Sequence, residues 1–202
     1  IDAKPCHSHE GAVGMRPAAP EQSGQLVPGG RIVWAARDHE LDCDVALKIL
    51  DPSLVRSSAF ARFCREVVLT RRITHPNVVK LFDILNLNGH SVMTMELVDG
   101  GSLKDWIRQE GALELDVAIH LLWEVALGLD AAHQLKILHR DIKPHNVLLS
   151  ADRRHAKLAD FGLSYSLIDS GTPITSKGVI LGTPTYMAPE FFAIHPVDAD
   201  AP

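Results

Sequence analysis

Three polar residues of different chemistry lie close together in the stretch ILHRDIKPHNVLLS, residues 137–150. Asp141, Lys143 and Asn146 supply a carboxylate, an ammonium and an amide between two apolar, strand-like pieces. A carboxylate can take a proton, an ammonium can neutralise phosphate charge, and an amide oxygen can hold a metal ion. The spacing therefore indicates one loop that combines these three functions, although each residue taken singly could equally be a surface ion-pair partner.

A second carboxylate follows nineteen residues after Asp141, in the segment KLADFG. Asp160 is separated from Gly162 by one phenylalanine, and a glycine leaves the backbone free to bend sharply. Carboxylate oxygens are ligands for hard cations such as Mg²⁺. The segment therefore predicts a metal-binding loop that contributes Asp160.

The elements that must position these loops follow from hydrophobic periodicity and turn residues. An Asn88-Gly89 turn separates two of the predicted strands, and Ser102 and Gly111 bound a short helix. In the long helix, Val117, Leu121, Leu122, Val125 and Leu129 fit one apolar face. Strands are predicted at 31–38, 44–50, 78–85, 90–98 and in the pieces NVLL and AKLA, and helices at 59–73, 102–111 and 113–134.

Composition narrows the class of protein. The chain has 202 residues and a net charge of −5, so no global basic field favours nucleic acid or an anionic membrane as a partner. Its three cysteines form no CxxC pair and suit a reducing compartment, so a cytoplasmic domain is expected, with a membrane anchor elsewhere in a parent protein left open. The segment CHSHE contains Cys6, His7 and His9, but a closed zinc site needs four ligands, and we interpret the segment as a solvated tail.

The chain resembles the eukaryotic-type protein kinase family, and its motifs are similar to those of bacterial serine/threonine kinases. Five signatures occur in the family's order: VALK with Lys48, REVV with Glu66, then HRDIKPHN, DFG and GTPTYMAPE. One signature alone would be weak, but five in order over about residues 31 to 190 are specific. The resemblance implies an α+β, two-lobed fold with a small β-rich N-lobe holding one helix and a partial, mainly helical C-lobe.

The resemblance also implies domain boundaries. Residues 1–25 would be a flexible lead, 26–98 the N-lobe with a doubtful first strand, and 99–202 a C-lobe truncated after the A-P-E motif. Because the chain begins with Ile1 and stops twelve residues after Glu190, we interpret it as an incomplete kinase domain. The long helix would then expose apolar surface.

The family implies a role for each polar residue, with ATP and Mg²⁺ as cofactors. Lys48 would contact the α- and β-phosphates and be held by Glu66. Asp141 would accept or orient the proton of the substrate hydroxyl, and Lys143 would neutralise the transferring phosphoryl group. The ions that bridge the phosphates would be held by Asn146 and Asp160.

The nucleotide and two packing positions also follow from the resemblance. His139 and Phe161 would belong to an internal hydrophobic spine rather than react. The adenine would lie between Val33 and Ala46 on one side and Leu148 on the other, and the hinge after Met95 would offer the backbone groups of Glu96 and Val98. The implied nucleotide-binding residues are Val33, Ala46, Lys48, Glu96, Val98 and Leu148.

Two features imply a protein substrate with a serine or threonine hydroxyl. Lys143 stands two residues after Asp141, and Thr183 lies in GTPTYMAPE, both as in the serine/threonine branch. A phosphate on the activation segment could pair with Arg140 and order that segment, or the segment could hold ordinary polar residues. The candidate autophosphorylation sites are Thr172, Thr175 and Ser176. The oligomeric state stays open.

The glycine-rich loop departs from the family pattern. With Val33 aligned to the family's valine, Leu26, Pro28 and Arg31 occupy the three glycine positions, and Gly29-Gly30 falls between them. Pro28 has no N–H to offer a phosphate. A pseudokinase that scaffolds or only binds nucleotide is therefore the main alternative, while Lys143 and GTPTYMAPE disfavour a kinase of small molecules.

Overall fold

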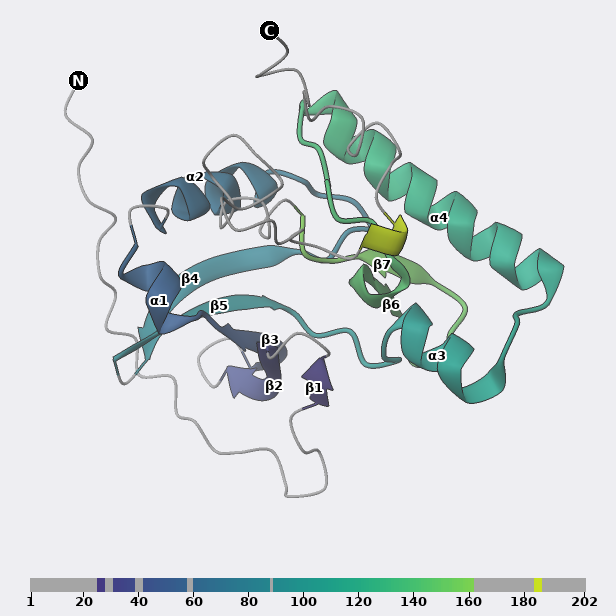
Figure 1. The fold of residues 1–202 in the computed structure, drawn as a ribbon, viewed down its shortest axis with the longest axis horizontal. Coiled ribbons are helices and arrows are strands. Elements are labelled where there is room, and N and C mark those ends of the chain that lie inside the picture. Colours follow the sequence, from purple (N-terminus) through teal and green to yellow (C-terminus); the bar gives the residue numbers. More distant parts are fainter. Residues whose placement is uncertain are drawn as a thin grey trace, which may run out of the picture.

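A computed structural model of the chain contains two lobes, which follow one another in sequence (Figure 1). The structure describes residues 25–27, 31–38, 42–57, 60–87, 89–161 and 184–186. The predicted lead, the three candidate phosphorylation sites and Thr183 lie outside these residues. A β-rich lobe precedes a mainly helical one, so the predicted α+β, two-lobed fold is confirmed.

The first lobe is built on one antiparallel sheet. Its strand order is β1-β2-β3-β5-β4, with each strand antiparallel to its neighbours. The β4–β5 turn contains Gly89 with φ of 82°, a conformation that favours glycine. The strands are β1 (Gln25–Val27), β2 (Arg31–Asp38), β3 (Cys43–Ile49), β4 (Leu81–Leu87) and β5 (His90–Glu96).

The first strand, doubtful from the sequence, is present at Gln25–Val27. It pairs with β2 in a register that joins Val27 to Arg31 and Gln25 to Val33. The strand is short because the Pro- and Gly-containing residues on both sides of it favour turns rather than a ladder. Its formation depends on β2, a longer strand that is itself paired on its other edge with β3.

Two helices belong to the first lobe, where the sequence predicted one. The missed helix is α1 (Pro52–Val55), and α2 (Phe60–Thr70) is the predicted one. Asp51 caps α1 by accepting a hydrogen bond from the backbone N–H of Ser53 at 2.7 Å, and Pro52 occupies the first turn. Asp-Pro-Ser is a helix-start signal, although the sequence analysis predicts no helix between the strand at 44–50 and the helix at 59–73.

The core of the first lobe lies between α2 and the sheet. Phe63, Val67 and Thr70 form the buried side of α2. The first two belong to a cluster with Ala46, Met93 and other residues of the sheet. This burial positions the central strands β3 and β5 under the helix.

The second lobe contains α3 (Leu103–Glu110), α4 (Leu115–Gln134) and a small hairpin, β6 (Val147–Leu149) with β7 (Ala156–Leu158). Ser102 caps α3 by accepting a hydrogen bond from the backbone N–H of Asp105 at 3.1 Å, and Gly111 ends it. Both boundaries were predicted. Two single turns of 3-10 helix complete the described elements, at Pro144–Asn146 and Pro184–Tyr186.

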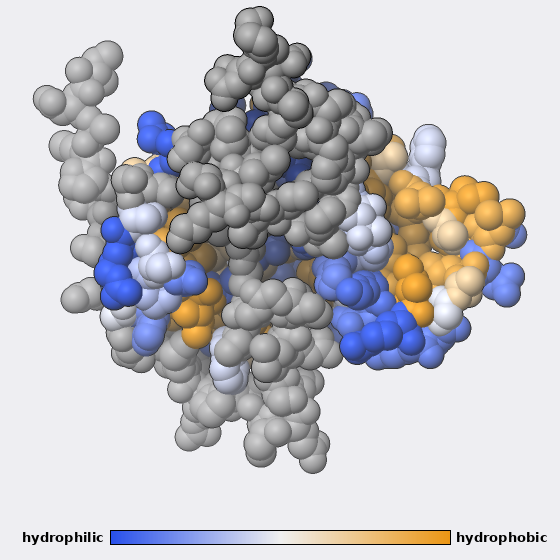
Figure 2. Space-filling model, in the orientation of Figure 1, coloured by the Kyte–Doolittle hydropathy of each residue, from blue (hydrophilic) through white to orange (hydrophobic). Residues whose placement is uncertain are grey.

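The buried face of α4 differs from the predicted one. Leu121 and Val125 are buried, but Leu122 is 63% exposed and Val117 is 37% exposed. The helix is apolar on more than one side, so periodicity alone did not identify the side that packs against β7. Figure 2 shows the resulting hydrophobic area over α4. Within the described residues, no helix combines the length and apolar character needed to span a bilayer.

Backbone hydrogen bonds attach both strands of the β6–β7 hairpin to the segments on either side of the five-stranded sheet. Leu158 of β7 donates to the carbonyl oxygen of Asn77 at 2.9 Å and accepts from Val79 at 2.8 Å. Leu149 of β6 accepts from Gly100 at 2.9 Å and donates to Gly101 at the same distance. The hairpin is therefore held in position by the segments that enter and leave the sheet. The polar loops that precede β6 and follow β7 are positioned by the hairpin in turn.

Candidate active site

The two groups predicted to face the phosphates and the metal meet in one ion pair. Lys48 lies on β3 and is only 5% exposed, among buried apolar neighbours on the same strand. A buried ammonium requires a charged partner, and the Nζ of Lys48 contacts Oδ1 of Asp160. Asp160 follows β7 and has φ of 61°, in the left-handed region that few non-glycine residues adopt. Strand and loop thus bring a cation and a carboxylate together from two lobes.

Glu66 lies on α2 and is half-buried. The helix packs over the strand that carries Lys48, because Val67 and Ala46 belong to the same cluster. The ion pair between Lys48 and Glu66 stays a prediction.

The second loop forms a connected polar cluster. The Nζ of Lys143 contacts both carboxylate oxygens of Asp141, at 2.9 Å and 2.8 Å. The Asn146 amide nitrogen donates to the backbone oxygen of Asp141 at 2.7 Å and to its Oδ2 at 3.0 Å. The 3-10 turn Pro144–Asn146 permits this closure, since it brings Asn146 back toward Asp141. The carboxylate, ammonium and amide predicted from the sequence therefore form one site.

Backbone and imidazole contacts fasten this loop to the segment that carries Asp160. Ala159, the residue before it, donates its N–H to the carbonyl oxygen of Asn146 at 2.8 Å. The carbonyl oxygen of Ala159 accepts a hydrogen bond from His139 at 2.9 Å. The two loops are therefore held in a common frame.

His139 and Phe161 pack together, as the spine interpretation expected. Each is 2% exposed, and their ring centroids are 4.5 Å apart. Burial lowers the pKa of His139, against the smaller raising effects of the Ala159 carbonyl and the nearby carboxylates. The imidazole is therefore held neutral, which fits packing and hydrogen bonding rather than proton transfer.

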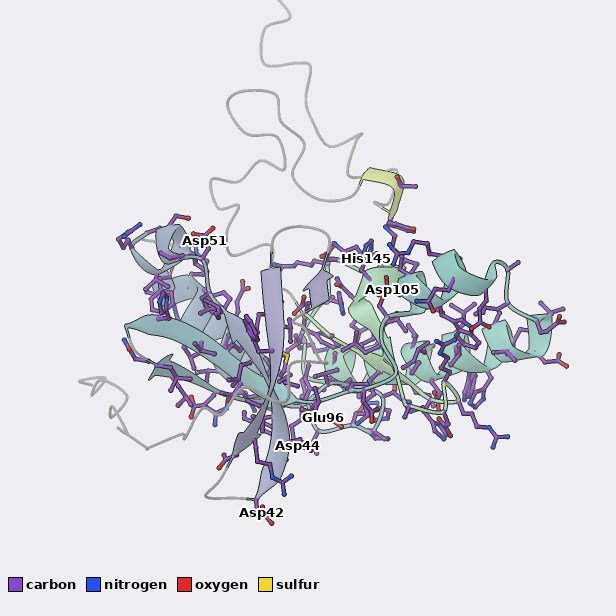
Figure 3. The ribbon with its side chains drawn as sticks, turned by 90° about the horizontal axis from the view of Figure 1, so that it is seen from below. Asp42, Asp44, Asp51, Glu96, Asp105 and His145 are labelled. Atoms are coloured by element: carbon purple, nitrogen blue, oxygen red, sulfur yellow. The ribbon has the colours of Figure 1, made fainter. Side chains whose placement is uncertain are left out.

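A neighbouring histidine also has a perturbed pKa. Burial lowers the pKa of His145, with Lys104 and Lys143 adding to the effect, while Asp105 opposes it. Figure 3 shows His145 and Asp105 close to one another at α3.

Four of the residues predicted to bind the nucleotide gather around one apolar cluster. Ala46 is a buried member of that cluster, and Val33, Val98 and Leu148 pack against it. Val33 and Ala46 come from neighbouring strands, whereas Leu148 comes from β6 in the other lobe. The structure thus brings together apolar residues from both lobes, as a flat base between them would require.

Glu96 marks the connection between the lobes (Figure 3). Its carboxylate forms an ion pair with Lys157 of β7 and accepts a hydrogen bond from the backbone N–H of Lys80 at 3.2 Å. Its own N–H donates to the carbonyl oxygen of Lys80 at 2.9 Å. Sequence reasoning missed Lys157, because the two partners are 61 residues apart and no local pattern links them.

Two of the positions that the family fills with glycine lie in paired strands of this fold. The register of β1 and β2 leaves residues 28–30 between the paired residues Val27 and Arg31. Leu26 and Arg31, which occupy two of the family's glycine positions, are therefore strand residues.

Comparisons with known proteins agree with this geometry. A family profile described as "Protein kinase domain" matches residues 29–201. The serine/threonine-protein kinase PknD of Mycobacterium tuberculosis is 37% identical over 161 residues, covering 79% of this chain and 24% of the relative. The serine/threonine-protein kinase PrkC of Bacillus subtilis is 34% identical over 181 residues, covering 88% of this chain and 28% of the relative.

A solved structure is similar over most of the chain. The crystal structure of Rad53 in complex with AMP-PNP matches with a TM-score of 0.65 and 25% identity, over 85% of this chain and 41% of that one. The chain spans about a quarter of the length of the curated relatives named above. On the fold, the polar site and these matches, the chain belongs to the protein kinase domain family.

Proposed function

We propose that this domain transfers the γ-phosphoryl group of ATP to a serine or threonine hydroxyl of a protein. The observation that carries the proposal is the contact between Lys48 and Asp160, which are 112 residues apart. Ala159 links this pair to the loop of Asp141 and Asn146 by a backbone hydrogen bond. The serine/threonine kinases among the relatives support the reaction type.

In this proposal Asp141 receives the proton of the attacking hydroxyl, and Lys143 stabilises charge on the transferring group. The Lys143 ammonium lies within 2.9 Å of both oxygens of Asp141. The carboxylate that accepts the proton and the ammonium that stabilises negative charge therefore lie side by side, where both can act on one substrate hydroxyl. Phosphoryl transfer depends mainly on such positioning and electrostatic stabilisation.

The residues present fit a magnesium ion. Asp160 offers carboxylate oxygens, and the two hydrogen bonds of the Asn146 side chain both use its nitrogen, so its amide oxygen makes neither. Oxygen ligands of this kind suit Mg²⁺. When bound, the ion would bridge and neutralise phosphate oxygens. Lys48, held by Asp160 in this structure, would turn its ammonium to the phosphates, with Glu66 as its expected second partner.

The proposed nucleotide pocket uses Val33, Ala46 and Leu148 around the base, with the backbones of Glu96 and Val98 beside it. Their common apolar cluster supports this, as does the nucleotide analogue named for Rad53. The displaced glycines would weaken backbone contacts to the phosphates, because Pro28 lacks an N–H.

The experiment measures transfer of labelled phosphate from Mg²⁺-ATP to a generic protein substrate. The 202-residue chain is compared with Asp141→Asn and with Asp130→Asn, an exposed carboxylate on α4, after circular dichroism has shown that all three fold. We expect transfer by the first and third proteins and none by Asp141→Asn. Equal transfer by all three, or none by a folded unsubstituted chain that still binds nucleotide, would overturn the proposal, the latter favouring a pseudokinase.

We also propose that Thr172, Thr175 or Ser176 is an autophosphorylation site. Arg140 supports this, because it adjoins Asp141 at the surface of the second lobe, and a guanidinium can pair with a phosphate. Mass spectrometry of chain incubated with ATP is the test. Phosphate on one of the three residues supports the proposal, and its absence from all three in an active preparation rejects it.

A cytoplasmic location is proposed from the thiols. Cys43 is a free cysteine, which suits a reducing compartment.

A further inference from the structure

Three metal-ligating side chains meet at the junction of α4 and the β6–β7 hairpin, apart from the site described above. His120 and Glu124 are one turn apart on α4, so they share a face of the helix. His155 immediately precedes β7. One ligand atom from each of the three residues lies within 4.8 Å of the other two. Two imidazoles and a carboxylate are a ligand set that zinc uses in proteins.

We propose that His120, Glu124 and His155 form a zinc site that connects α4 to the β6–β7 hairpin. The spacing of the ligand atoms supports this proposal. His155 Nδ1 lies 2.8 Å from Glu124 Oε1, and His120 Nε2 lies 3.7 Å from the same oxygen. Ligand atoms around a tetrahedral zinc ion, with bonds of about 2.0–2.1 Å, are about 3.3 Å apart. The observed distances fall on both sides of that value.

The two histidines have room to make the small adjustment needed. Their side chains are 53% and 62% exposed for His120 and His155, respectively, so neither ring is held by surrounding packing. Both line an open hollow of about 810 Å³. Zinc with three protein ligands commonly takes a water molecule as its fourth, and this hollow would admit one.

Glu124 is already oriented for binding a metal ion. The residue is 9% exposed, and its Oε2 accepts a hydrogen bond from the backbone N–H of Ala156 at 2.6 Å. That bond leaves Oε1 as the oxygen shared by the two histidines. Contacts that fix a ligating carboxylate in this way strengthen metal binding.

Two existing hydrogen bonds would have to be given up. His155 Nδ1 donates its proton to Glu124 Oε1 at 2.8 Å, and His120 Nε2 donates its proton to the carbonyl oxygen of Arg154 at 3.1 Å. A zinc-bound nitrogen carries no proton, so both hydrogen bonds would be lost. The carbonyl oxygen would then lie near the ion as another possible oxygen ligand. The charge around the hollow is mixed, since Asp116 and Asp152 line it together with Arg153 and Arg154.

The zinc site would stabilise the elements that position the kinase site and would take no part in phosphoryl transfer. The hairpin strand β7 runs from Ala156 to Leu158 and leads directly to Asp160. A metal bridge between α4 and the start of β7 would therefore resist separation of the helix from the strand that positions Asp160. Zinc-dependent stabilisation is expected whether or not nucleotide is bound.

The alternative is that the three side chains form only hydrogen bonds between helix and hairpin. Zinc chloride is therefore titrated into the 202-residue chain by calorimetry, with excess Mg²⁺ present to occupy the kinase site. Cys6, His7 and His9 are replaced by alanine in every protein, which removes the zinc ligands of the segment CHSHE. His120→Asn and His155→Asn test the cluster, and His133→Gln, an exposed histidine on the same helix, is the matched control.

We expect one zinc equivalent in the parent chain and in His133→Gln, with at least tenfold weaker binding in His120→Asn and His155→Asn. Co²⁺ in place of zinc should give tetrahedral d–d absorption that the two cluster variants lose. Circular dichroism verifies that each variant is folded. Absence of binding by the folded parent, or equal binding in the cluster variants and the control, overturns the proposal.

Discussion

The imidazole of His139 donates a hydrogen bond from Nε2 to the carbonyl oxygen of Ala159, 2.9 Å away. Nε2 must be the donor, because a carbonyl oxygen can only accept. The other ring nitrogen, Nδ1, accepts from the backbone N–H of Asp141 at 3.3 Å. One buried ring thus touches the backbone beside both carboxylates of the proposed active site.

Replacing this ring should destabilise the second lobe. In His139→Leu the carbonyl of Ala159 loses its buried donor, so we expect a loss of about 1–3 kcal/mol in the free energy of unfolding. Urea denaturation measures this loss. His133→Gln, an exposed histidine on α4, is the control and should unfold like the parent. Equal stability of His139→Leu and the parent would show that the hydrogen bond makes no net contribution to the free energy of unfolding.

The same histidine should make stability depend on pH. Burial lowers the pKa of His139 below its ordinary value of 6.5, so the unfolded chain takes up a proton more readily than the folded chain. Its contribution is therefore fully present above about pH 6.5 and is lost as pH falls from there toward the folded pKa. The stability difference between the parent and His139→Leu should shrink over that range. Denaturation curves at pH 7.5 and at successively lower pH test this, and a difference that grows on acidification would contradict it.

Removal of the buried lysine should abolish most transfer. Lys48→Met leaves the Asp160 carboxylate without its Lys48 contact and removes the charge proposed to face the phosphates. We expect the rate of phosphate transfer to fall by about 100-fold or more, the size of effect seen when one electrostatic contact to a transition state is lost. Lys80→Met, an exposed lysine of the same lobe, should leave the rate unchanged. A rate unaffected by Lys48→Met would remove this residue from the proposed mechanism.

Nucleotide binding should require magnesium through Asp160. Calorimetric titration of ATP should show saturable binding with Mg²⁺, and chelation of the ion or Asp160→Asn should weaken it. Asp130→Asn serves as the control carboxylate. Binding that is equally tight without Mg²⁺, or in Asp160→Asn, would argue against the assigned metal ligand.

Replacing a glycine of α4 by alanine should destabilise the protein, although alanine has the higher helix propensity. A Cβ added at Gly128 would lie 2.7 Å from the carbonyl oxygen of Asn77, closer than a carbon atom can approach backbone without displacement. Gly128→Ala would gain about 1 kcal/mol from propensity, but close packing against backbone costs about 1–3 kcal/mol, so we expect net destabilisation. Ala126→Gly, at an exposed position nearby, should lose about 1 kcal/mol from propensity alone. A more stable Gly128→Ala in urea denaturation would show that α4 can shift away from Asn77.

Local chemistry made several elements predictable. Ser102 and Gly111 bound α3 because a side-chain cap and a glycine end act on backbone groups within a few residues. The turn at Gly89 was predictable for the same reason. The short helix after Asp51 was missed, although its Asp-Pro-Ser start signal was present.

The sequence by itself determined the kinase family, the polar loop of Asp141, Lys143 and Asn146, and most elements. Their residue types and short spacings act locally, and ordered motifs identify the family. Only the tertiary structure decided the partner of Lys48, the attachment of Glu96 to Lys157 and the buried side of α4. These depend on chain segments that are distant in sequence. Glu124, a charged residue, is buried because the hairpin supplies its hydrogen-bond donor, which no helical period could predict.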